Sequence, residues 1–371
     1  MLRGGRNLAV RILFLLPFAA AAATMAQPVL SPEIHPDRKV TFRVRALNAQ
    51  KVELALETFP RREMQKGGDG VWTVTTGPLE PDIYGYTFVI DGAGFVDPSN
   101  GMTKPNALSV SSAVLVPGDP PQMWEQTQAP HGAVHHHFYE SAIAGDRRDY
   151  LVYTPPNYDP KKRYPLLVLC HGFSDYADGW TAVGRAHFVL DNLIARGEAK
   201  PLIVVMPLGY GVALDTLRAG VQRPPEFWKQ NAGKFSEALL AEVLPAVERS
   251  YRVEQKPEKR AIAGLSMGGG EALLVGLNHL DRFGWIGAFS AGGFPPSFDE
   301  VYPKLGERDN VRIRLLWIAC GKEDRLVEPN RKFTEWLTSR GVRHTWIETP
   351  GAHTWPVWRR YLAEFVKLLK W

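Results

Sequence analysis

The stretch RAIAGLSMGGGEALLVGLNH, residues 260–279, contains a single serine between glycines where a short apolar run changes into a helical pattern. The run is β-compatible and apolar side chains then recur at helical spacing, so the stretch predicts a strand, a sharp turn and a helix. Gly264 and Gly268 suit such a turn because a Cβ at either position would collide with the crossing strand and helix. This context favours a nucleophilic role for Ser266 over that of an ordinary turn serine.

The chain from about residue 140 onward alternates apolar strands with longer amphipathic segments. Such alternation predicts an α/β fold with a doubly wound, mostly parallel sheet covered on both faces by helices, and functional side chains at the carboxyl ends of the strands. Pro245 is expected to kink or split one helix. The expected strands lie near residues 150–154, 165–170, 202–206, 260–264, 285–290, 313–320 and 342–348, and the expected helices near 183–196, 235–250, 267–279, 330–340 and 356–369.

Two further candidate residues follow apolar strands downstream of Ser266. Asp324 lies in GKEDRL, after RLLWIAC, and His353 lies in GAHTW, after VRHTWIETP. A serine hydroxyl is a weak nucleophile at neutral pH and needs a base that an acid orients. The chain order serine, acid, histidine is that of the α/β-hydrolases. We therefore expect a catalytic triad of Ser266, Asp324 and His353, the alternative being a solvated loop histidine and a turn-forming aspartate.

The loop LCHGFSDYADGW follows an early buried strand and is the expected source of an oxyanion donor. The backbone N–H groups of Met267 and Phe173 are the candidate donors, because one begins the helix after the serine and the other lies in this loop. Ordinary core packing is the alternative for the tryptophans nearby. The residues expected to line the substrate pocket are Gly172, Trp180 and Trp355.

The remaining histidines have other expected roles. His171 should brace the loop that follows its strand. The run HGAVHHHFY places His135, His136 and His137 in succession, and neighbouring residues of an extended strand point to opposite faces. Such side chains do not converge on one ion, and no cysteine or carboxylate cluster completes a site, so we expect no metal.

The two cysteines of the chain, Cys170 and Cys320, each end an apolar strand-like run. An exported protein could form a disulfide between them. In a doubly wound sheet, however, these two strand ends need not be neighbours. We expect two buried free thiols.

Residues 1–26 have the pattern of a secretory signal peptide. Arg3, Arg6 and Arg11 precede an apolar run over residues 12–23, which is shorter than the roughly 20 residues that a membrane-spanning helix needs. We therefore expect a secreted or periplasmic protein with no stable membrane anchor after cleavage. Without the three arginines the net charge falls from +5 to +2, so we expect no nucleic-acid partner.

Residues 32–117 have a different pattern from the rest of the chain. Short alternating strands separated by turn signals, such as KVTFRVRA, KVELAL and IYGYTFVIDG, predict a small immunoglobulin-like β-sandwich. The Pro-rich residues 118–134 then form a linker. We expect this linker to join two independently cored units, the sandwich and an α/β unit over residues 135–371.

The stretches GLSMGG, LCHGFSDYADGW, IACGKEDRL and GAHTWPVW together resemble the esterase family that holds bacterial feruloyl esterases, acetylxylan esterases and enterochelin-esterase-like proteins, with an α/β-hydrolase fold. Residues 34–117 resemble the early-set β-sandwich that often precedes these esterases and is similar to glycogen-binding-type modules. Matched motif by motif, the resemblance implies a nucleophile at Ser266, an acid at Asp324 and a base at His353. It also implies oxyanion donors at Met267 and near Phe173.

The motifs and the resemblance imply an exported serine esterase that acts through an acyl-enzyme and requires no cofactor. The expected substrate is a feruloyl or acetyl ester on plant cell-wall polysaccharide such as xylan, since export and an added sandwich suit an extracellular polymer. One alternative is a siderophore trilactone esterase, for which Arg185, Arg218 and Arg223 would supply a cationic pocket. Another is a non-catalytic binding protein on the same fold.

Overall fold

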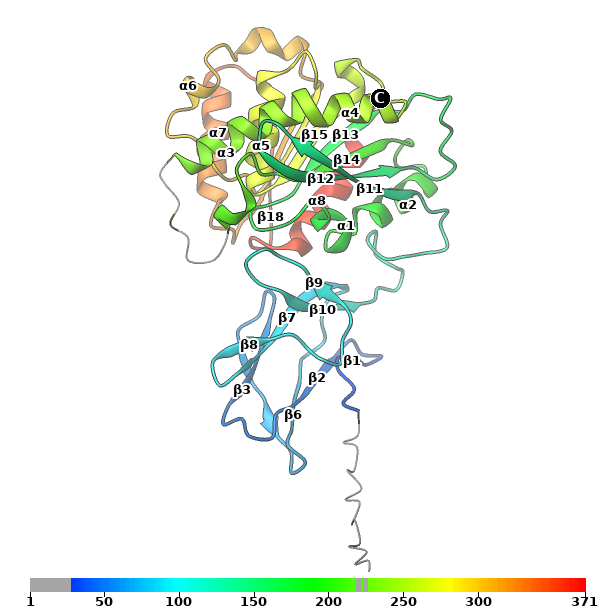
Figure 1. The fold of residues 1–371 in the computed structure, drawn as a ribbon, viewed down its shortest axis with the longest axis vertical. Coiled ribbons are helices and arrows are strands. Elements are labelled where there is room, and N and C mark those ends of the chain that lie inside the picture. The colour runs from blue at the N-terminus through cyan, green and yellow to red at the C-terminus, as the bar shows by residue number, and fades with distance from the viewer. Residues whose placement is uncertain (1–27, 218–221, 223–225) are drawn as a thin grey trace, which may run out of the picture.

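The computed structural model of the chain describes residues 28–217, 222 and 226–371, so the expected signal peptide lies outside the described residues. Figure 1 shows two stacked parts, with the N-terminal strands below and a larger sheet flanked by helices above. Among the described residues, every helix is too short or too polar to span a bilayer.

The larger part is built on one eight-stranded sheet. Its strands are β11 (Ala133–Ser141), β12 (Asp146–Thr154), β13 (Leu166–Cys170), β14 (Ile203–Pro207), β15 (Arg260–Leu265), β16 (Trp285–Phe289), β17 (Leu315–Gly321) and β18 (Thr345–Thr349). Their order is β11-β12-β14-β13-β15-β16-β17-β18. All neighbours from β14 to β18 pair in parallel, whereas β11 and β12 form an antiparallel hairpin at one edge. The four central strands, β14, β13, β15 and β16, are buried at every residue, as a covered parallel sheet requires.

Helices cover both faces of this sheet. They are α1 (Gly179–Ala182), α2 (Ala186–Ala195), α3 (Phe227–Ala238), α4 (Leu244–Ser250), α5 (Met267–Asn278), α6 (Phe298–Val301), α7 (Val327–Ser339) and α8 (Trp355–Leu368). Helices α1, α2 and α8 pack in one hydrophobic cluster, and α3, α4, α5 and α7 pack in a second. Leu167 and Leu169 belong to the first cluster and Leu166 and Val168 to the second, because successive strand residues point to opposite faces.

Pro245 interrupts the α-helical hydrogen bonding of the helix expected over residues 235–250. The chain runs from α3 through a π-helical turn, Leu239–Val243, into α4, which holds Pro245 in its first turn. Proline has no N–H for the helical hydrogen bond, and its ring would clash with the preceding turn. The helical run nevertheless continues without a break from residue 227 to residue 250, so the α-helical hydrogen bonding is interrupted here but the helix is not split in two.

The N-terminal part consists of two antiparallel sheets. Its strands are β1 (Glu33–Ile34), β2 (Val40–Arg45), β3 (Val52–Leu56), β4 (Arg62–Glu63), β5 (Gln65–Lys66), β6 (Val71–Thr75), β7 (Asp82–Ile90), β8 (Ala93–Phe95), β9 (Thr103–Lys104) and β10 (Ser111–Val116). One sheet has the order β1-β2-β6-β5 and the other β4-β3-β7-β10-β9, with β8 paired to β7. Phe42 and Trp72 of the first sheet share a buried cluster with Leu54 and Phe88 of the second, so the sheets face each other. The immunoglobulin-like assignment stays a prediction.

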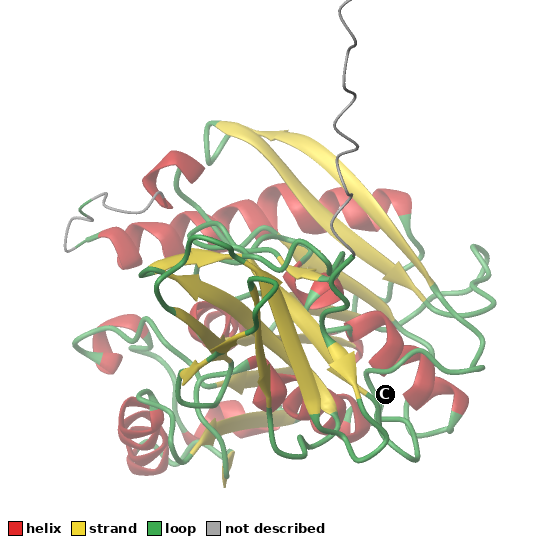
Figure 2. Ribbon diagram, turned by 90° about the horizontal axis from the view of Figure 1, so that it is seen from below, coloured by secondary structure: helices red, strands yellow, loops and turns green. Residues whose placement is uncertain are grey.

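Each part has a buried core of its own, but the two parts also share buried contacts. Ile83 and Ala113 of the N-terminal sheets lie in the same buried cluster as α8 of the larger part. The Asp82 carboxylate accepts a hydrogen bond from Arg359 of α8 at 2.7 Å, and both side chains are buried. Seen from below, the N-terminal strands lie in front of the larger part (Figure 2). Breaking a buried ion pair costs about 3–5 kcal/mol, so this contact ties the parts together.

The expected linker is docked rather than free. Trp124 is buried in the cluster that contains α2, and the Asn192 side chain of α2 donates to the carbonyl oxygens of Met123 and Glu125. His131 Nδ1 lies 2.9 Å from the buried carboxylate of Asp191. The proline content indicated a loop, but the polar and aromatic residues between the prolines hold that loop on the helix.

Both cysteines are free and buried, as predicted. Cys170 ends β13 and Cys320 lies in β17. Strands β15 and β16 lie between them in the sheet. This separation explains why the two thiols are not joined.

Candidate active site

Ser266 stands in a sharp turn between β15 and α5. Its φ and ψ angles are 52° and −118°, a conformation that non-glycine residues rarely adopt. A Cβ on Gly264 would lie 2.3 Å from the carbonyl oxygen of Gly268, and a Cβ on Gly268 would lie 2.4 Å from that of His171. Only glycine fits at these two positions, so the turn that raises Ser266 above the sheet depends on both.

Ser266, His353 and Asp324 form one chain of hydrogen bonds. His353 Nε2 lies 3.0 Å from Ser266 Oγ, and His353 Nδ1 lies 2.8 Å from Asp324 Oδ2. Because Asp324 is an acceptor, the proton sits on Nδ1 and Nε2 is left as the base that faces the serine. The structure therefore brings together the three residues that the sequence predicted.

The environment keeps Asp324 ionised. Burial by itself raises the pKa of this carboxyl, but the hydrogen bonds from His353 and from the Leu326 N–H outweigh it and hold the pKa below its usual value. The carboxylate can then stabilise an imidazolium on His353. Its side chain is fully enclosed, whereas that of His353 is 20% exposed and can meet a substrate.

Asp324, and not its neighbour Glu323, is the carboxylate bonded to the imidazole. The Glu323 side chain is exposed, and its carboxylate accepts a hydrogen bond from the backbone N–H of Gly351. Gly351 lies two residues before His353. Glu323 therefore fastens the loop that carries the histidine.

Two further residues, Trp358 and Ser290, lie near the histidine, and the serine was not identified from the sequence. The indole of Trp358 meets the His353 ring edge to face at 4.8 Å, and its Nε1 donates to Ser290 Oγ at 3.2 Å. Ser290 also hydrogen bonds to Asp324, which helps to hold the pKa of that carboxyl low. Ser290 directly follows β16, so the rule that functional groups gather at carboxyl strand ends could have found it.

The loop after β13 passes next to the serine. A Cβ on Gly172 would lie 2.5 Å from Leu265 Cδ1 and 3.5 Å from Ser266 Cβ, so a side chain here would touch the serine and would require the Leu265 side chain to move. Phe173 follows Gly172, and Met267 begins α5 immediately after the serine. The backbone of both candidate oxyanion donors is thus beside Ser266.

His171 braces this loop, as predicted. Its Nε2 accepts a hydrogen bond from the Gly209 N–H at 2.8 Å, so Nδ1 carries the proton and donates to the Gly172 carbonyl oxygen at 2.8 Å. Burial lowers the pKa of His171 to about 4, and the ring stays neutral. It acts as a fixed spacer between two loops.

A buried carboxyl lies beneath the serine turn. Glu271 of α5 is fully enclosed, and its Oε1 accepts a hydrogen bond from Asn231 Nδ2 at 3.2 Å. Asn231 also accepts from the Gly211 N–H at 3.1 Å, which links α3 and α5 to the loop after β14. Burial raises the pKa of Glu271 well above its usual value, which favours the neutral acid.

Trp180 and Trp355 do not line an open pocket, contrary to expectation. Trp180 is completely buried and Trp355 is 2% exposed. They pack edge to face on one another at 5.2 Å, and Trp180 Nε1 donates to the Cys170 carbonyl oxygen. Both rings pack in the hydrophobic core. The sequence pattern alone does not distinguish a tryptophan in the core from one that lines a pocket.

An aromatic group that the sequence analysis missed lies beside the Gly172 loop. The Phe173 ring meets Trp228 of α3 edge to face at 5.1 Å and Tyr210 at 6.4 Å. The Trp228 side chain is 40% exposed. Tyr210 is buried, so Phe173 and Trp228, rather than the two core tryptophans, offer apolar surface beside the Gly172 loop.

The three consecutive histidines have three separate partners. His135 contacts Thr154 Oγ1, His136 contacts the Asp149 carboxylate and His137 contacts the Tyr251 hydroxyl. Within the described part of the chain, no group of three or more His, Cys, Asp or Glu side chains is arranged to hold a metal ion.

Of the arginines considered for a cationic pocket, only Arg185 lies among the described residues. Its guanidinium stacks over the Phe188 ring at 5.7 Å. Arg218 and Arg223 are outside the described residues.

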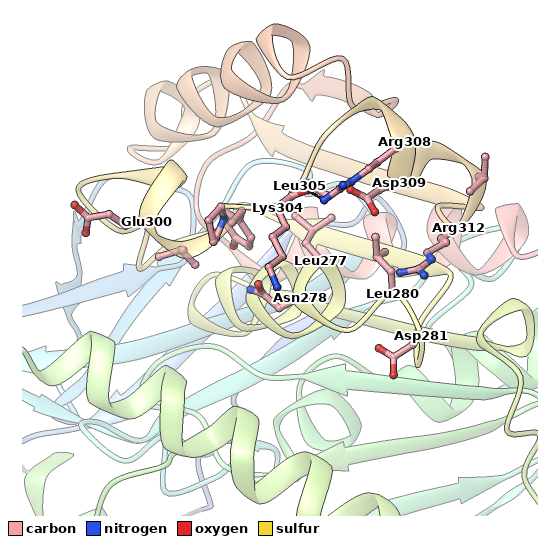
Figure 3. Close-up of a pocket in the computed structure, with 14 residues that line it drawn as sticks. Leu277, Asn278, Leu280, Asp281, Glu300, Lys304, Leu305, Arg308, Asp309 and Arg312 are labelled. Carbon is pink, nitrogen blue, oxygen red and sulfur yellow. Dashed lines mark hydrogen bonds between the residues drawn. The ribbon is translucent and has the colours of Figure 1, made fainter.

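A separate surface hollow of about 830 Å³ lies at the far end of α5 from the serine (Figure 3). Charged side chains of both signs line it, and none belongs to the predicted site. The hydrogen-bonded triad, and not the size of a hollow, locates the candidate chemistry. The charged residues around this hollow are Asp281, Glu300, Lys304, Arg308, Asp309 and Arg312.

Two curated relatives share much of this chain. An endo-1,4-beta-xylanase/feruloyl esterase of Xylanibacter ruminicola is 29% identical over 348 residues, covering 91% of this chain and 46% of the relative. An iron(III) enterobactin esterase of Escherichia coli is 25% identical over 268 residues, covering 70% of this chain and 61% of the relative. The chain thus spans less than two thirds of the length of either relative.

Solved structures and a family model complete the comparison. A ferulic acid esterase of Anaeromyces mucronatus matches with a TM-score of 0.58 and 25% identity over 67% of this chain and 94% of that one. An enterobactin esterase of Shigella flexneri has a TM-score of 0.65 over 89% of this chain and 93% of that one, and at 19% identity it shows the fold alone. The Esterase family model matches residues 141–369, well over half of the chain and all three residues of the triad. By this match the chain belongs to the Esterase family.

Proposed function

We propose that the protein hydrolyses carboxylic esters through an acyl-enzyme on Ser266. The observation that carries this proposal is the hydrogen-bond chain from Ser266 Oγ through His353 to the enclosed Asp324. The strained turn at Ser266 and the membership of the Esterase family support the same chemistry.

Acylation follows from the positions of these groups. Ser266 Oγ attacks the ester carbonyl carbon while His353 Nε2 takes the hydroxyl proton, and Asp324 stabilises the imidazolium that results. The N–H groups of Met267 and Phe173 donate to the oxyanion that forms on the carbonyl oxygen. The tetrahedral intermediate then releases the alcohol, which receives the proton from Nε2.

Deacylation repeats these steps with water. Nε2 of His353 takes a proton from a water molecule as that oxygen attacks the acyl carbon. The second intermediate collapses to the free acid, and Nε2 returns the proton to Ser266 Oγ. No redox step and no co-reactant other than water enters this cycle, so we propose that the reaction requires no cofactor.

The acyl group that we propose is hydroxycinnamoyl, as in a feruloyl ester. Phe173 follows the glycine that lies against Ser266, and its ring belongs to the aromatic group with Trp228. An aromatic acid bound to Ser266 could add to this group in edge-to-face or offset contacts, each worth about 0.5–1.5 kcal/mol. The relatives whose names include feruloyl or ferulic acid esterase support this choice.

We further propose that the protein is exported and acts on esters attached to plant cell-wall polysaccharide. The arginine-rich start and apolar run of residues 1–26 support export. The relative from Xylanibacter ruminicola combines a xylanase with a feruloyl esterase in its name, which supports xylan as the alcohol component. A nucleic-acid partner is not part of this proposal, because the net charge without that segment is small.

A siderophore trilactone is the second candidate substrate. The likeness to the enterobactin esterase structure extends over both parts of the chain and not only over the larger part. Against it, the guanidinium of Arg185 is already stacked on Phe188. The third reading, a binding protein without activity, has no support from the intact Ser266–His353–Asp324 chain.

One experiment separates these candidates. The initial rates of the wild type and of Ser266→Ala are measured on methyl ferulate, p-nitrophenyl acetate, acetylated xylan and enterobactin. Methyl ferulate should give the highest kcat/KM, and the variant should lose about three or more orders of magnitude in turnover. A higher value on enterobactin or acetylated xylan would move the substrate assignment. Equal rates for both proteins would refute the serine mechanism.

A further inference from the structure

A loop of the N-terminal sheets touches the loop that carries the candidate oxyanion donor. This loop connects β9 to β10. Its Ala107 N–H donates to the Ser174 carbonyl oxygen at 2.7 Å. Its Asn106 Nδ2 donates to Ser174 Oγ at 2.9 Å and to Asp175 Oδ1 at 3.1 Å. Asn106 therefore binds the two residues that directly follow Phe173.

The contacted loop is one that needs support. Ser174 has a φ of 71°, a left-handed conformation that costs a non-glycine residue about 1–3 kcal/mol unless its surroundings enforce it. The Asp175 N–H donates back to the Gly172 carbonyl oxygen, and its own carbonyl accepts from the Tyr210 hydroxyl. Phe173 thus lies inside a tight turn that Asn106 closes from outside.

The Asp175 carboxyl adds a second reason for this contact. It is 5% exposed, and burial raises its pKa to about 7. The hydrogen bond from Asn106 and the charge of Lys104 act in the opposite sense and favour the carboxylate. Both of these partners come from the N-terminal sheets, so the loop is incomplete in a chain that lacks them.

We infer that Asn106 is a positioning residue for the oxyanion hole, and that the N-terminal sheets thereby complete the active site. The inference rests on the proposed ester hydrolysis. Oxyanion donors must be placed to a fraction of an ångström, and losing one costs about 10²–10³ in kcat. Asn106 acts through Ser174 and Asp175 and touches no reacting atom.

The test compares substitutions at Asn106 in the full-length protein, with p-nitrophenyl acetate as substrate. Asn106→Ala should lower kcat by about 10- to 100-fold and leave KM within about threefold, because the oxyanion forms only in the transition state. Asn106→Asp should lower kcat further, since a second carboxylate would face Asp175. The double variant Asn106→Asp/Asp175→Asn reverses donor and acceptor and should recover most of the loss.

Thr127→Ala is the matched control. Thr127 lies on the docked segment between the two parts, and its hydroxyl donates to Asn192 Oδ1 at 2.6 Å, away from the oxyanion loop. It should keep the wild-type kcat. An unchanged kcat in Asn106→Ala would overturn the inference. An equal loss of kcat in Asn106→Ala and in the control Thr127→Ala would do so as well. The inference would also be overturned if the double variant Asn106→Asp/Asp175→Asn stayed as slow as Asn106→Asp.

The same data distinguish the two levels of the proposal. If the wild type and the Asn106 variants are equally active, the proposed ester hydrolysis stands and only the positioning role of Asn106 is refuted. Wild type that neither hydrolyses the ester nor reacts with a fluorophosphonate removes the proposed function and this inference together.

Discussion

Asp324 and Asp82 are both buried carboxylates with a basic partner, yet they belong to different kinds of site. Asp324 binds His353, 29 residues away, at 2.8 Å, and His353 keeps part of its ring exposed. Asp82 binds Arg359, 277 residues away, at 2.7 Å, and neither side chain reaches solvent. In the proposed mechanism the first pair presents a base to a substrate, whereas the second joins the N-terminal sheets to α8. Burial and pairing alone therefore do not identify a catalytic carboxylate, and the buried Asp191 with its part-exposed partner His131 shows that a titratable partner does not either. The contact of His353 Nε2 with Ser266 Oγ sets the Asp324 pair apart.

The largest expected effect tests the catalytic pair. Asp324→Asn should reduce kcat by about two to four orders of magnitude, because an amide favours the wrong imidazole tautomer and cannot stabilise the imidazolium. The unfolding temperature should change far less than the activity. Initial rates on one ester at one pH, together with circular dichroism, measure both.

Glu323→Gln is the matched control for this variant. Its side chain is exposed and its partner is the Gly351 N–H, a bond that a glutamine oxygen can still accept. The activity of this variant should stay within about fivefold of the wild type, since a neutral hydrogen bond differs by only about 1 kcal/mol. If Glu323→Gln lost more activity than Asp324→Asn, the acid would have to be moved by one residue.

The Asp82–Arg359 pair should give the reverse result, a loss of stability with the activity retained. Asp82→Asn leaves Arg359 buried without its counter-charge and should lower the free energy of unfolding by about 3–5 kcal/mol. The kcat of the folded fraction at 20 °C, a temperature chosen as roughly that of maximum stability, should stay within about threefold. Urea unfolding and initial rates on the same sample separate the two quantities.

Glu80→Gln serves as the control, because Glu80 is 82% exposed and its ion pair with Arg38 spans 3.8 Å. An exposed pair of this kind contributes little to stability. A loss of activity in Asp82→Asn as large as that in Asp324→Asn would erase the distinction between the two carboxylates.

A third buried carboxyl, Glu271, has no basic partner among its hydrogen bonds to described residues, and its effect on stability should depend on pH. Its pKa in the folded protein is raised by burial, so the folded state holds a proton that the unfolded chain releases above its ordinary value of 4.5. Stability is then lost as the pH rises above that value. Glu271→Gln removes this loss, and its unfolding temperature should gain on the wild type by about 2–6 °C between pH 5 and pH 8. Scanning calorimetry at both values measures the difference.

The exposed Glu237 of α3 gives the control for this pH series. Glu237→Gln should follow the wild type at every pH. A constant offset between Glu271→Gln and the wild type would show that the buried carboxyl does not change its protonation on unfolding.

The candidate triad could be predicted because its members are local to strand ends. Ser266 directly follows β15, Asp324 and His353 lie in the short loops after β17 and β18, and parallel strands bring their carboxyl ends to one edge of the sheet. Gly264 and Gly268 also pointed to Ser266, because a sharp turn there leaves no room for a Cβ at either position. No long-range packing had to be known for this part.

The contacts between the two parts could not be predicted in the same way. Asp82, Asn106 and Trp124 stand in no motif, and their partners are distant in the chain. Alternating apolar residues revealed the N-terminal strands, but alternation does not say which sheet edge docks on which helix. Trp180 and Trp355 were misassigned for a related reason, since composition near a site does not reveal exposure.

The central claim, that Ser266 is the nucleophile of an esterase, has one direct measurement. The full-length protein is incubated with a fluorophosphonate, digested and examined by mass spectrometry, with Ser266→Ala treated in parallel. A single adduct on the peptide that contains Ser266, absent from the variant and strongly slowed in Asp324→Asn, is the expected result. An adduct on another residue, or equal labelling of the wild type and Ser266→Ala, would contradict the account.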